Sequence, residues 1–199
     1  MKNYITLSAV EEQLYFNMIQ IQRKDLPLKD FITTFECKLN EPEMDKQIKK
    51  IIDKYGDKQN HKTNVKAQMT EWKMWHEPGF KKLASIALDI SKQISKLKYN
   101  DHINPMLTDL WGVKYKSEEI TVPHAHWPSL WSFVYYINAP KNAPGLFFPN
   151  MGEQGGERKI EPGLLIFFEG HTKHAVRPAK FKGYRYVVSG NIKEDLKNV

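Results

Sequence analysis

Two short groups of histidines, far apart in the chain, carry the strongest chemical signal of the sequence. His124 and His126 are separated by one residue and stand just before an apolar run. His174 follows a second apolar run later in the chain. Residues at i and i+2 of an extended chain point to the same side, so the first pair can bind one metal ion from a single strand end. A histidine from a distant strand would then close one face of that ion.

Histidine ligands limit which metals can bind and what kind of site they can form. Neutral imidazole suits iron, zinc, copper and nickel, and three ligands on one face leave the opposite face open for chemistry. Cys37 is the only cysteine, which excludes an internal disulfide and a cysteine-based zinc site. The candidate ligands are His124, His126 and His174. No role is expected for the histidines of the more helical part, His61, His76 and His102.

Arg185 and a pair of tyrosines are candidates for binding a second ligand. Arg185 lies in the strand-like run that follows His174, and antiparallel neighbours would place its guanidinium beside the metal. Its planar fork of donors suits a carboxylate, whereas the alternative is a surface ion pair. Tyr135 and Tyr136 occupy the middle of another run, so one of them faces inward and offers an apolar wall and a hydroxyl donor. The alternative for both tyrosines is ordinary core packing.

The elements that position these residues change in kind near residue 105. Before it, Phe31–Leu39 is expected to be extended, and two packing helices are expected to follow. The first helix opens at Pro42 and stops at Gly56. The second opens at Pro78 and keeps the 3.6-residue apolar period to about Leu97.

The second part of the chain reads as short strands separated by turn-rich pieces. The candidate strands are Leu110–Tyr115, Ser129–Ile137, Leu146–Phe148, Leu164–Phe168, Ala175–Arg177 and Tyr184–Ser189. Many short strands with such breaks indicate a sandwich or barrel, including the jelly roll. The mouth of such a structure is a common place for a ligand.

Composition bounds the class of protein. The chain has 199 residues, of which 41% are hydrophobic and 27% charged, as expected for one globular domain spanning 1–199. We expect a mostly helical flank with the first strands over 1–105 and a core with the metal site over 106–199. No apolar run approaches the roughly 20 residues of a membrane-spanning helix. Glu11 and Glu12 interrupt the position of a signal peptide, and with a single cysteine this favours a cytoplasmic protein.

The net charge of +7 is spread along the chain rather than gathered in a basic block. A lysine-rich solvated surface is the simpler interpretation, so nucleic acid is not an expected partner.

Six pieces of the chain, taken together, resemble the iron(II)- and 2-oxoglutarate-dependent oxygenases near the prolyl-hydroxylase-like group. They are, in order, HAH, VYYIN, PGLFFP, PGLLIFF, HAVRP and YRYVVSGN, and they span about a third of the chain. No single piece is specific, but their order and spacing agree with the family as a set. The resemblance implies an α+β fold with a double-stranded β-helix core, the jelly roll that cupins also have, flanked by the N-terminal helices.

The resemblance also implies roles for individual residues. His124 would be the proximal ligand and His174 the distal ligand of Fe(II). Arg185 would pair with the distal carboxylate of 2-oxoglutarate, Tyr136 would donate to the same carboxylate, and Ser189 would add a hydroxyl. The implied activity is hydroxylation of a small-molecule or peptide substrate, with release of succinate and CO2.

One departure from the family pattern concerns the third metal ligand. The family has a carboxylate where this chain has His126. Three outcomes are open: a working three-histidine site, a carboxylate from elsewhere, of which Glu118 and Glu119 are nearest in the sequence, or a weakened site. A further subgroup of these oxygenases has HxHP before a similar strand, and HAHWPSLWSFVYY resembles it too, which favours an intact site.

Two rival functions follow from the same residues. A cupin-like metal protein without 2-oxoglutarate would also use HxH and a later histidine. Cupins usually add a glutamate soon after HxH, and none occurs between His126 and Glu153, which disfavours this rival. The other rival is a non-catalytic jelly-roll module. In each case the entrance to the site is expected near 138–145, 150–156 and Ala67–Glu77.

Overall fold

The computed structural model describes residues 22–26, 32–56, 63–100, 103–151 and 156–195. Phe31, His61, His102, Glu153 and the rest of 152–155 lie outside the described residues, as do Glu11 and Glu12. The division of the chain at residue 105 stays a prediction.

Both expected helices are confirmed. Helix α2 (Pro42–Tyr55) begins with a proline, which suits the first turn, and buries Met44, Ile48 and Ile52. Helix α3 (Pro78–Tyr99) also begins with a proline and ends at Asn100, which adopts the left-handed conformation that asparagine tolerates. No helix in the described part of the chain is long and apolar enough to cross a bilayer. Two short 3₁₀ turns, η1 (Met74–His76) and η2 (Pro149–Met151), complete the helical elements described.

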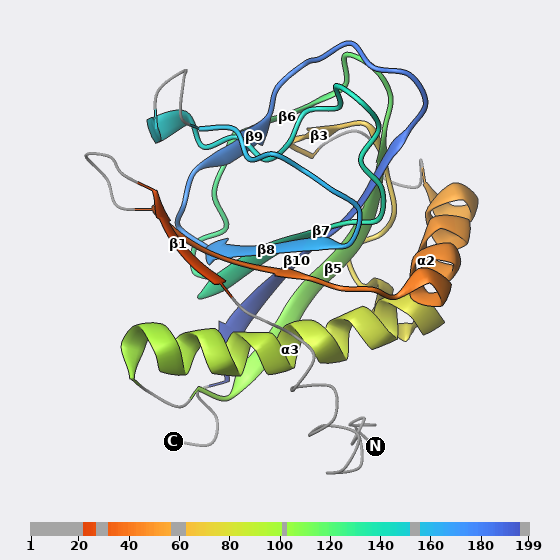
Figure 1. Ribbon diagram of the computed structural model, residues 1–199. Helices are drawn as coiled ribbons and strands as arrows, with labels where there is room; N and C mark the ends of the chain where they lie inside the picture. Colours follow the sequence, from red (N-terminus) through yellow and green to blue (C-terminus); the bar gives the residue numbers. More distant parts are fainter. Residues whose placement is uncertain (1–21, 27–31, 57–62, 101–102, 152–155, 196–199) are drawn as a thin grey trace.

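The strands form two antiparallel sheets that face each other (Figure 1). The larger sheet has the order β1-β2-β8-β7-β10-β5-β4 and the smaller has the order β3-β6-β9. The strands are β1 (Gln22–Leu26), β2 (Ile32–Lys38), β3 (Val65–Lys66), β4 (Gln68–Met69), β5 (Pro105–Tyr115), β6 (Ile120–His124), β7 (Trp131–Tyr136), β8 (Leu164–Glu169), β9 (His174–Val176) and β10 (Arg185–Glu194). This two-sheet arrangement is the expected jelly-roll core, with α2 and α3 packed as a flank.

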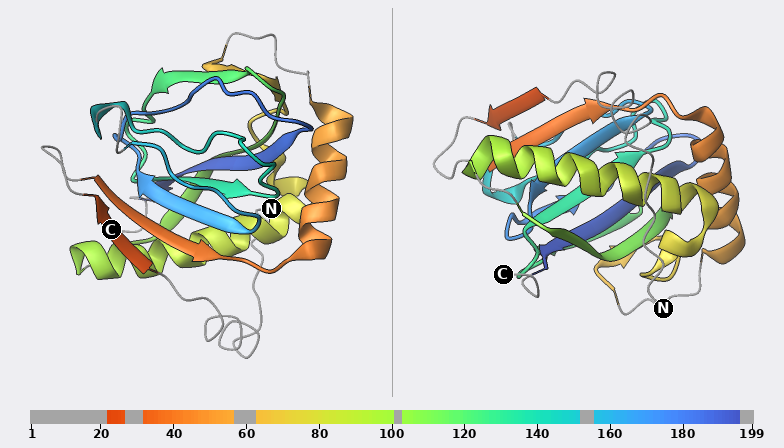
Figure 2. Two further views of the ribbon diagram at one scale, coloured as in Figure 1. Left: turned by 45° about the horizontal axis from the view of Figure 1, so that its top comes forward. Right: turned by 90° about the horizontal axis from the view of Figure 1, so that it is seen from below.

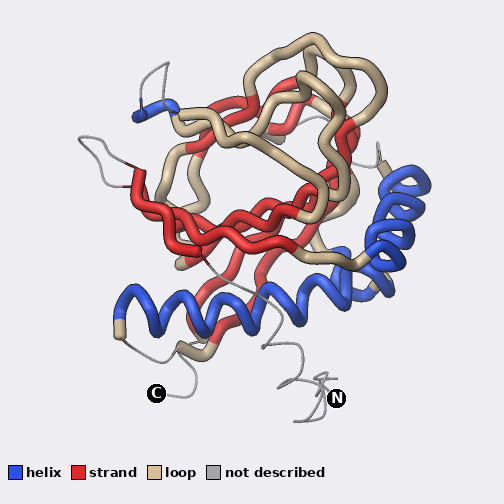
Figure 3. The backbone as a smooth tube through the Cα atoms, viewed as in Figure 1, coloured by secondary structure: helices blue, strands red, loops and turns tan. Residues whose placement is uncertain are grey.

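The helices cover only one face of the larger sheet, opposite the smaller sheet (Figures 2 and 3). One apolar core therefore lies between the helices and the larger sheet, and a second lies between the two sheets. Strand alternation sends neighbouring residues to different cores. Tyr135 faces the helices, where its hydroxyl donates to Asp45 at 2.7 Å, and Tyr136 faces the space between the sheets.

The expected strands differ from the structure in particular places. Leu146–Phe148 is not a regular strand: Phe147 forms only isolated bridges, to Glu157 and to Ala175. Strands β5 and β10 extend beyond the predicted limits, because they pair with each other over ten registered residue pairs. The short strands β3, β4 and β6 were not expected, and β6 carries the first metal-ligand candidate at its end.

Candidate metal centre

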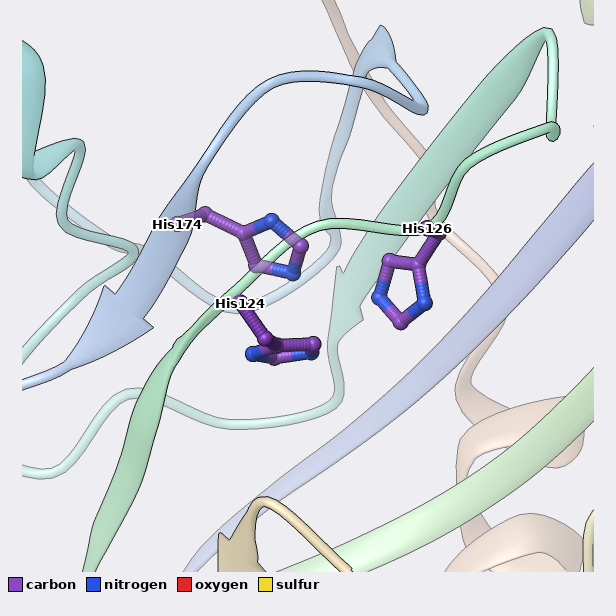
Figure 4. A group of neighbouring side chains, drawn as sticks. All are labelled: His124, His126 and His174. Atoms are coloured by element: carbon purple, nitrogen blue, oxygen red, sulfur yellow. The ribbon is translucent and has the colours of Figure 1, made fainter.

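The smaller sheet brings the two distant histidines face to face. His124 is the last residue of β6, His174 is the first residue of β9, and the two are registered opposite each other in the antiparallel ladder. His126 follows the end of β6 and its backbone N–H donates to the carbonyl of Gly170 at 2.7 Å. All three rings converge on one point (Figure 4). The predicted convergence of these side chains is therefore present in the structure.

The distances between the three rings suit a shared metal ion. The ring centroids of His124 and His174 are 4.4 Å apart, those of His124 and His126 are 4.7 Å apart, and those of His126 and His174 are 5.0 Å apart. One ring nitrogen from each lies within 4.8 Å of the others. Nitrogens bound to one ion at about 2.1 Å lie roughly 3 to 4 Å apart, so the rings need only small adjustments.

Hydrogen bonds to the backbone prepare two of the rings as ligands. The Nδ1 atom of His124 lies 2.8 Å from the carbonyl oxygen of Val122, and that of His174 lies 3.0 Å from the carbonyl of Thr172. A carbonyl only accepts, so in each ring Nδ1 carries the proton and Nε2 keeps its lone pair. These two rings are therefore held in the form that binds a metal through Nε2.

Burial keeps the three imidazoles neutral. Desolvation lowers the pKa of His124, and it lowers the pKa of His126 to about 4, with a further contribution from His124. His174 is buried, and desolvation together with the two neighbouring rings lowers its pKa well below the ordinary value. A neutral ring is the form that donates an electron pair to a metal, so the cluster is ready to bind a cation at neutral pH.

The open side of the cluster faces a cavity between the two sheets. Its lining includes the three histidines and the other candidate residues, namely Tyr136, Arg185 and Ser189, together with Trp111, Tyr115 and Thr121. Apolar side chains such as Leu146, Phe168 and Val187 fill the remaining wall. The cavity thus combines a metal-binding end with an apolar body and a few polar groups, as small-molecule sites commonly do.

Arg185 is the most unusual residue of this cavity. Its side chain is 1% exposed, its Nη1 donates to the carbonyl of Pro144, and its guanidinium lies 4.1 Å from the centre of the Tyr115 ring. Its Nε has no hydrogen-bond partner, and no carboxylate of the described residues forms an ion pair with it. A buried cation without an anion is costly, so the arrangement indicates a ligand that brings a negative charge. The alternative of a surface ion pair is wrong.

Two further candidate residues line the same cavity as Arg185. Tyr136 is fully buried, and desolvation raises the pKa of its hydroxyl against the opposing effect of the Arg185 charge, so the hydroxyl stays a donor. Ser189 follows Arg185 on the same face of β10 and lines the cavity. The roles that the resemblance implies for both residues stay predictions, and both residues line the cavity that contains Arg185.

Trp111 is a cavity residue that sequence reasoning missed. Its Nε1 is buried without a partner, which makes it a second unused donor in the same cavity. Its indole packs against Trp72 with the ring centroids 4.7 Å apart. Trp72 lies in the stretch expected near the entrance, and here it supports the cavity wall. The inward alternation of Trp111, Val113 and Tyr115 along β5 is the signal that would have identified it.

No carboxylate joins the three histidines within the part of the chain that the structure describes. The Glu119 carboxylate instead accepts from the backbone N–H of Lys116 at 2.6 Å, and Glu118 lies in the same turn with a positive φ. Glu118 and Glu119 therefore do not supply the missing ligand. Of the three possibilities left open by the sequence, the geometry favours the three-histidine site.

The loop over 138–145 reaches the cavity, because Pro144 supplies the carbonyl that meets Arg185. In the stretch 150–156, Met151 is buried in the core between the two sheets. In Ala67–Glu77, Met74 is buried in the core between the helices and the sheet. The first of the three expected entrance segments thus contacts a candidate residue directly.

Comparison with known proteins finds similarity in structure only. No family model matches the sequence, and no curated protein matches it in sequence. Among solved structures, a viral collagen prolyl hydroxylase, vCPH from Paramecium Bursaria Chlorella virus-1, in complex with 2-oxoglutarate, is similar with a TM-score of 0.57 and 18% identity, over 80% of this chain and 96% of that one.

Two other solved structures share the same architecture. HygX from Streptomyces hygroscopicus, with nickel and 2-oxoglutarate bound, has a TM-score of 0.59 and 6% identity, over 96% of this chain and 89% of that one. A prolyl hydroxylase from Trichoplax adhaerens, in complex with a peptide fragment of hypoxia inducible factor, has a TM-score of 0.52 and 15% identity, over 80% of this chain and 83% of that one. At these identities the similarity concerns the fold, and the chain has the double-stranded β-helix core that the sequence motifs predicted.

Proposed function

We propose that the protein is an iron(II)- and 2-oxoglutarate-dependent oxygenase that hydroxylates its substrate and releases succinate and CO2. The observation that carries the proposal is the presence, in one cavity, of three neutral histidines and a buried arginine that forms no ion pair with any described residue. The solved structures of similar fold, two of which hold 2-oxoglutarate, support it further.

The donor set fits both iron and 2-oxoglutarate. His124, His126 and His174 would hold iron, and Arg185 with Tyr136 would bind the distal carboxylate of 2-oxoglutarate, with Ser189 nearby. Iron with bound 2-oxoglutarate supplies the oxidising power for inserting oxygen into a C–H bond, and the chemistry belongs to these groups rather than to the protein.

The protein contributes placement, charge and exclusion of water. The apolar wall of the cavity strengthens the attraction between the Arg185 guanidinium and a carboxylate, because the local dielectric constant is low. The hydrogen bond from Arg185 to the Pro144 carbonyl fixes the guanidinium, so little entropy is lost when the carboxylate binds.

The proposed substrate is a small molecule or a peptide, and the proposed setting is the cytosol. The peptide complex of the Trichoplax hydroxylase supports the first point. The single cysteine, which is buried, supports the cytosolic setting, because disulfides are rare in a reducing compartment.

Succinate formation tests the proposal. The purified protein is given Fe(II), ascorbate and 2-oxoglutarate, and succinate is followed over time against a His174→Ala control. Succinate above the control is expected. A wild-type protein that contains iron but forms no more succinate than the control would refute the enzymatic function.

A cupin-like metal protein without 2-oxoglutarate is the second candidate, and the histidine at position 126 in place of a carboxylate favours it. Thermal unfolding separates the two functions, because a ligand that binds only the native state raises the midpoint. Addition of 2-oxoglutarate to the metal-loaded protein is expected to raise it, and an unchanged midpoint would favour the cupin-like function.

A further inference from the structure

A row of polar side chains crosses the larger sheet below the metal centre. Asn191 is 4% exposed and lies on β10, in register with Ser132 of β7 on one side and Asp109 of β5 on the other. Strand β10 passes below the ring of His126 in Figure 4, and Nδ2 of Asn191 lies 3.4 Å from Nδ1 of that ring. The row therefore connects a metal-ligand candidate to a carboxylate on another strand.

The position of the Asp109 carboxylate is fixed by its neighbours. Its Oδ2 accepts hydrogen bonds from Nδ2 of Asn191 at 3.2 Å and from the hydroxyl of Thr108 at 3.0 Å. The register of β5 and β10 shifts here, so that Thr108 is an extra residue between the pairs made by Asp109 and Leu107, and such irregularities redirect side chains. The Asn191 amide is held in turn, because its Oδ1 accepts from the Ser132 hydroxyl at 2.9 Å.

The Asp109 carboxylate is close to the metal centre and has no cationic partner of its own in the described part of the chain. No lysine or arginine described by the structure forms an ion pair with it, and its hydrogen bonds come from an amide and a hydroxyl. Its Oδ2 is at most 6.6 Å from Nδ1 of His126, the length of the two contacts of Asn191 Nδ2 together. This separation is shorter than the roughly 8 Å over which physiological salt screens a charge, and Asp109 is half-buried, which weakens the screening further.

The three candidate ligands bring no negative charge to the metal centre. Neutral imidazoles donate electron pairs but leave the two positive charges of a divalent ion without a counter-charge. Arg185 lines the same cavity and adds another positive charge, and the apolar walls strengthen every electrostatic interaction there. A carboxylate beside the ligands would therefore stabilise a bound cation.

We propose that Asp109 is the counter-charge of the metal centre: its carboxylate stays outside the set of ligands and stabilises a divalent cation bound by the three histidines. The inference rests on the metal site of the proposed function. The competing role for Asp109 is that of a hydrogen-bond acceptor that only holds the Asn191 amide and the irregular β5 in place. The two roles predict opposite effects for two substitutions at this position.

Asp109→Asn removes the charge and keeps both the size of the side chain and an oxygen that accepts from Asn191. Asp109→Glu keeps the charge and changes the length of the side chain. Asp45→Asn is the matched control, because it removes the same charge from a partly buried carboxylate on the other face of the larger sheet, where Asp45 accepts from the Tyr135 hydroxyl. Co(II) affinity is measured by anaerobic titration, and the Fe(III)/Fe(II) potential of the iron-loaded protein is measured by redox titration.

We expect Asp109→Asn to weaken Co(II) binding about 10- to 100-fold, as is typical for the loss of an outer partner of a metal site. Asp109→Glu should bind Co(II) nearly as tightly as the wild type, and Asp45→Asn should bind it equally well. The Fe(III)/Fe(II) potential of Asp109→Asn should rise, because loss of a nearby negative charge disfavours the more positive ion. Asp109→Ser is a second neutral variant and should behave in the same way, so it decides if Asp109→Asn does not fold.

The outcomes separate this inference from the proposed function. Unchanged Co(II) binding in the neutral variants, a loss in Asp109→Glu or Asp45→Asn as large as theirs, or a potential that does not rise would each overturn the inference alone. A wild-type protein that binds no Co(II) would overturn the proposed function and the inference together.

Discussion

Replacement of Arg185 by methionine should separate ligand binding from folding. The buried guanidinium has an unpartnered Nε and no carboxylate partner among the described residues, so its removal leaves no described carboxylate unpaired. Replacing a buried ionic group by an apolar side chain of similar volume is often neutral or stabilising. We therefore expect the free energy of unfolding of Arg185→Met to stay within about 1 kcal/mol of the wild type or to rise.

Binding of 2-oxoglutarate should fall strongly in the same variant. Removing one partner of a buried, hydrogen-bonded charge pair costs about 2 to 5 kcal/mol, much of it the penalty of leaving the other charge unpaired. This corresponds to a roughly 30- to 5,000-fold weaker affinity. The measurement is anaerobic calorimetric titration of the metal-loaded protein.

A second ligand makes the result specific to the distal carboxylate. 2-Oxobutyrate has the same keto-acid end and lacks that carboxylate, so its weaker affinity should be the same in the wild type and in Arg185→Met. Equal losses for the two ligands would mean that Arg185 only supports the cavity. Unchanged affinity for 2-oxoglutarate would refute the assignment of the arginine.

Three further predictions concern the two faces of the larger sheet, the buried Cys37 thiol and the pH dependence of metal binding. Tyr135→Phe, which removes a hydroxyl that donates to Asp45, should lower the free energy of unfolding by about 1 kcal/mol without changing 2-oxoglutarate affinity. Tyr136→Phe should weaken the affinity for 2-oxoglutarate. If calorimetry showed a loss of affinity in Tyr135→Phe and none in Tyr136→Phe, the assignment of Tyr136 to the cavity would be contradicted. Burial raises the pKa of the Cys37 thiol from 9.0 to about 12, so the folded state holds this proton more tightly than the unfolded state does. The free energy of unfolding therefore falls as the pH rises above 9. In urea unfolding between pH 7 and 10, the wild type should lose about 1.4 kcal/mol more of this free energy than Cys37→Ala. Because burial lowers the pKa of all three histidines, fewer protons compete with the metal. Co(II) affinity should therefore fall less between pH 8 and 6 than the roughly 70-fold that three ordinary imidazoles would lose.

Elements with a local signal were predictable from the sequence. The proline starts and the apolar period of α2 and α3 are encoded within each helix, and the alternation around Tyr136 and Arg185 is encoded within each strand. The candidate ligands His124, His126 and His174 were found in the same way, since their spacing is itself the signal. Their meeting was expected because a histidine on a distant strand would close one face of the ion, and the family pattern supported it, but no local rule relates β6 to β9.

Features that depend on partners elsewhere in the chain were not predictable. Strands β3 and β4 have two residues each, and they form because they pair with β6 and β5, respectively. Strand β6 contains Pro123, which obscures its strand character in the sequence. The position of Asn191 was also not predicted: asparagine is depleted in strands, and only the pairing of the strands shows that it lies between Asp109 and Ser132.

The pairing of β6 with β9 gives a bound ion a mechanical consequence as well as a chemical one. An ion held by His124 and His174 cross-links two residues that face each other in the ladder and closes a loop of 50 residues, 174 minus 124. Such a cross-link restricts the unfolded chain more than the folded one, as a covalent bridge would. In a chain without disulfides, the ion would therefore brace the small sheet, and its loss would loosen that sheet before the helix-backed sheet beneath it.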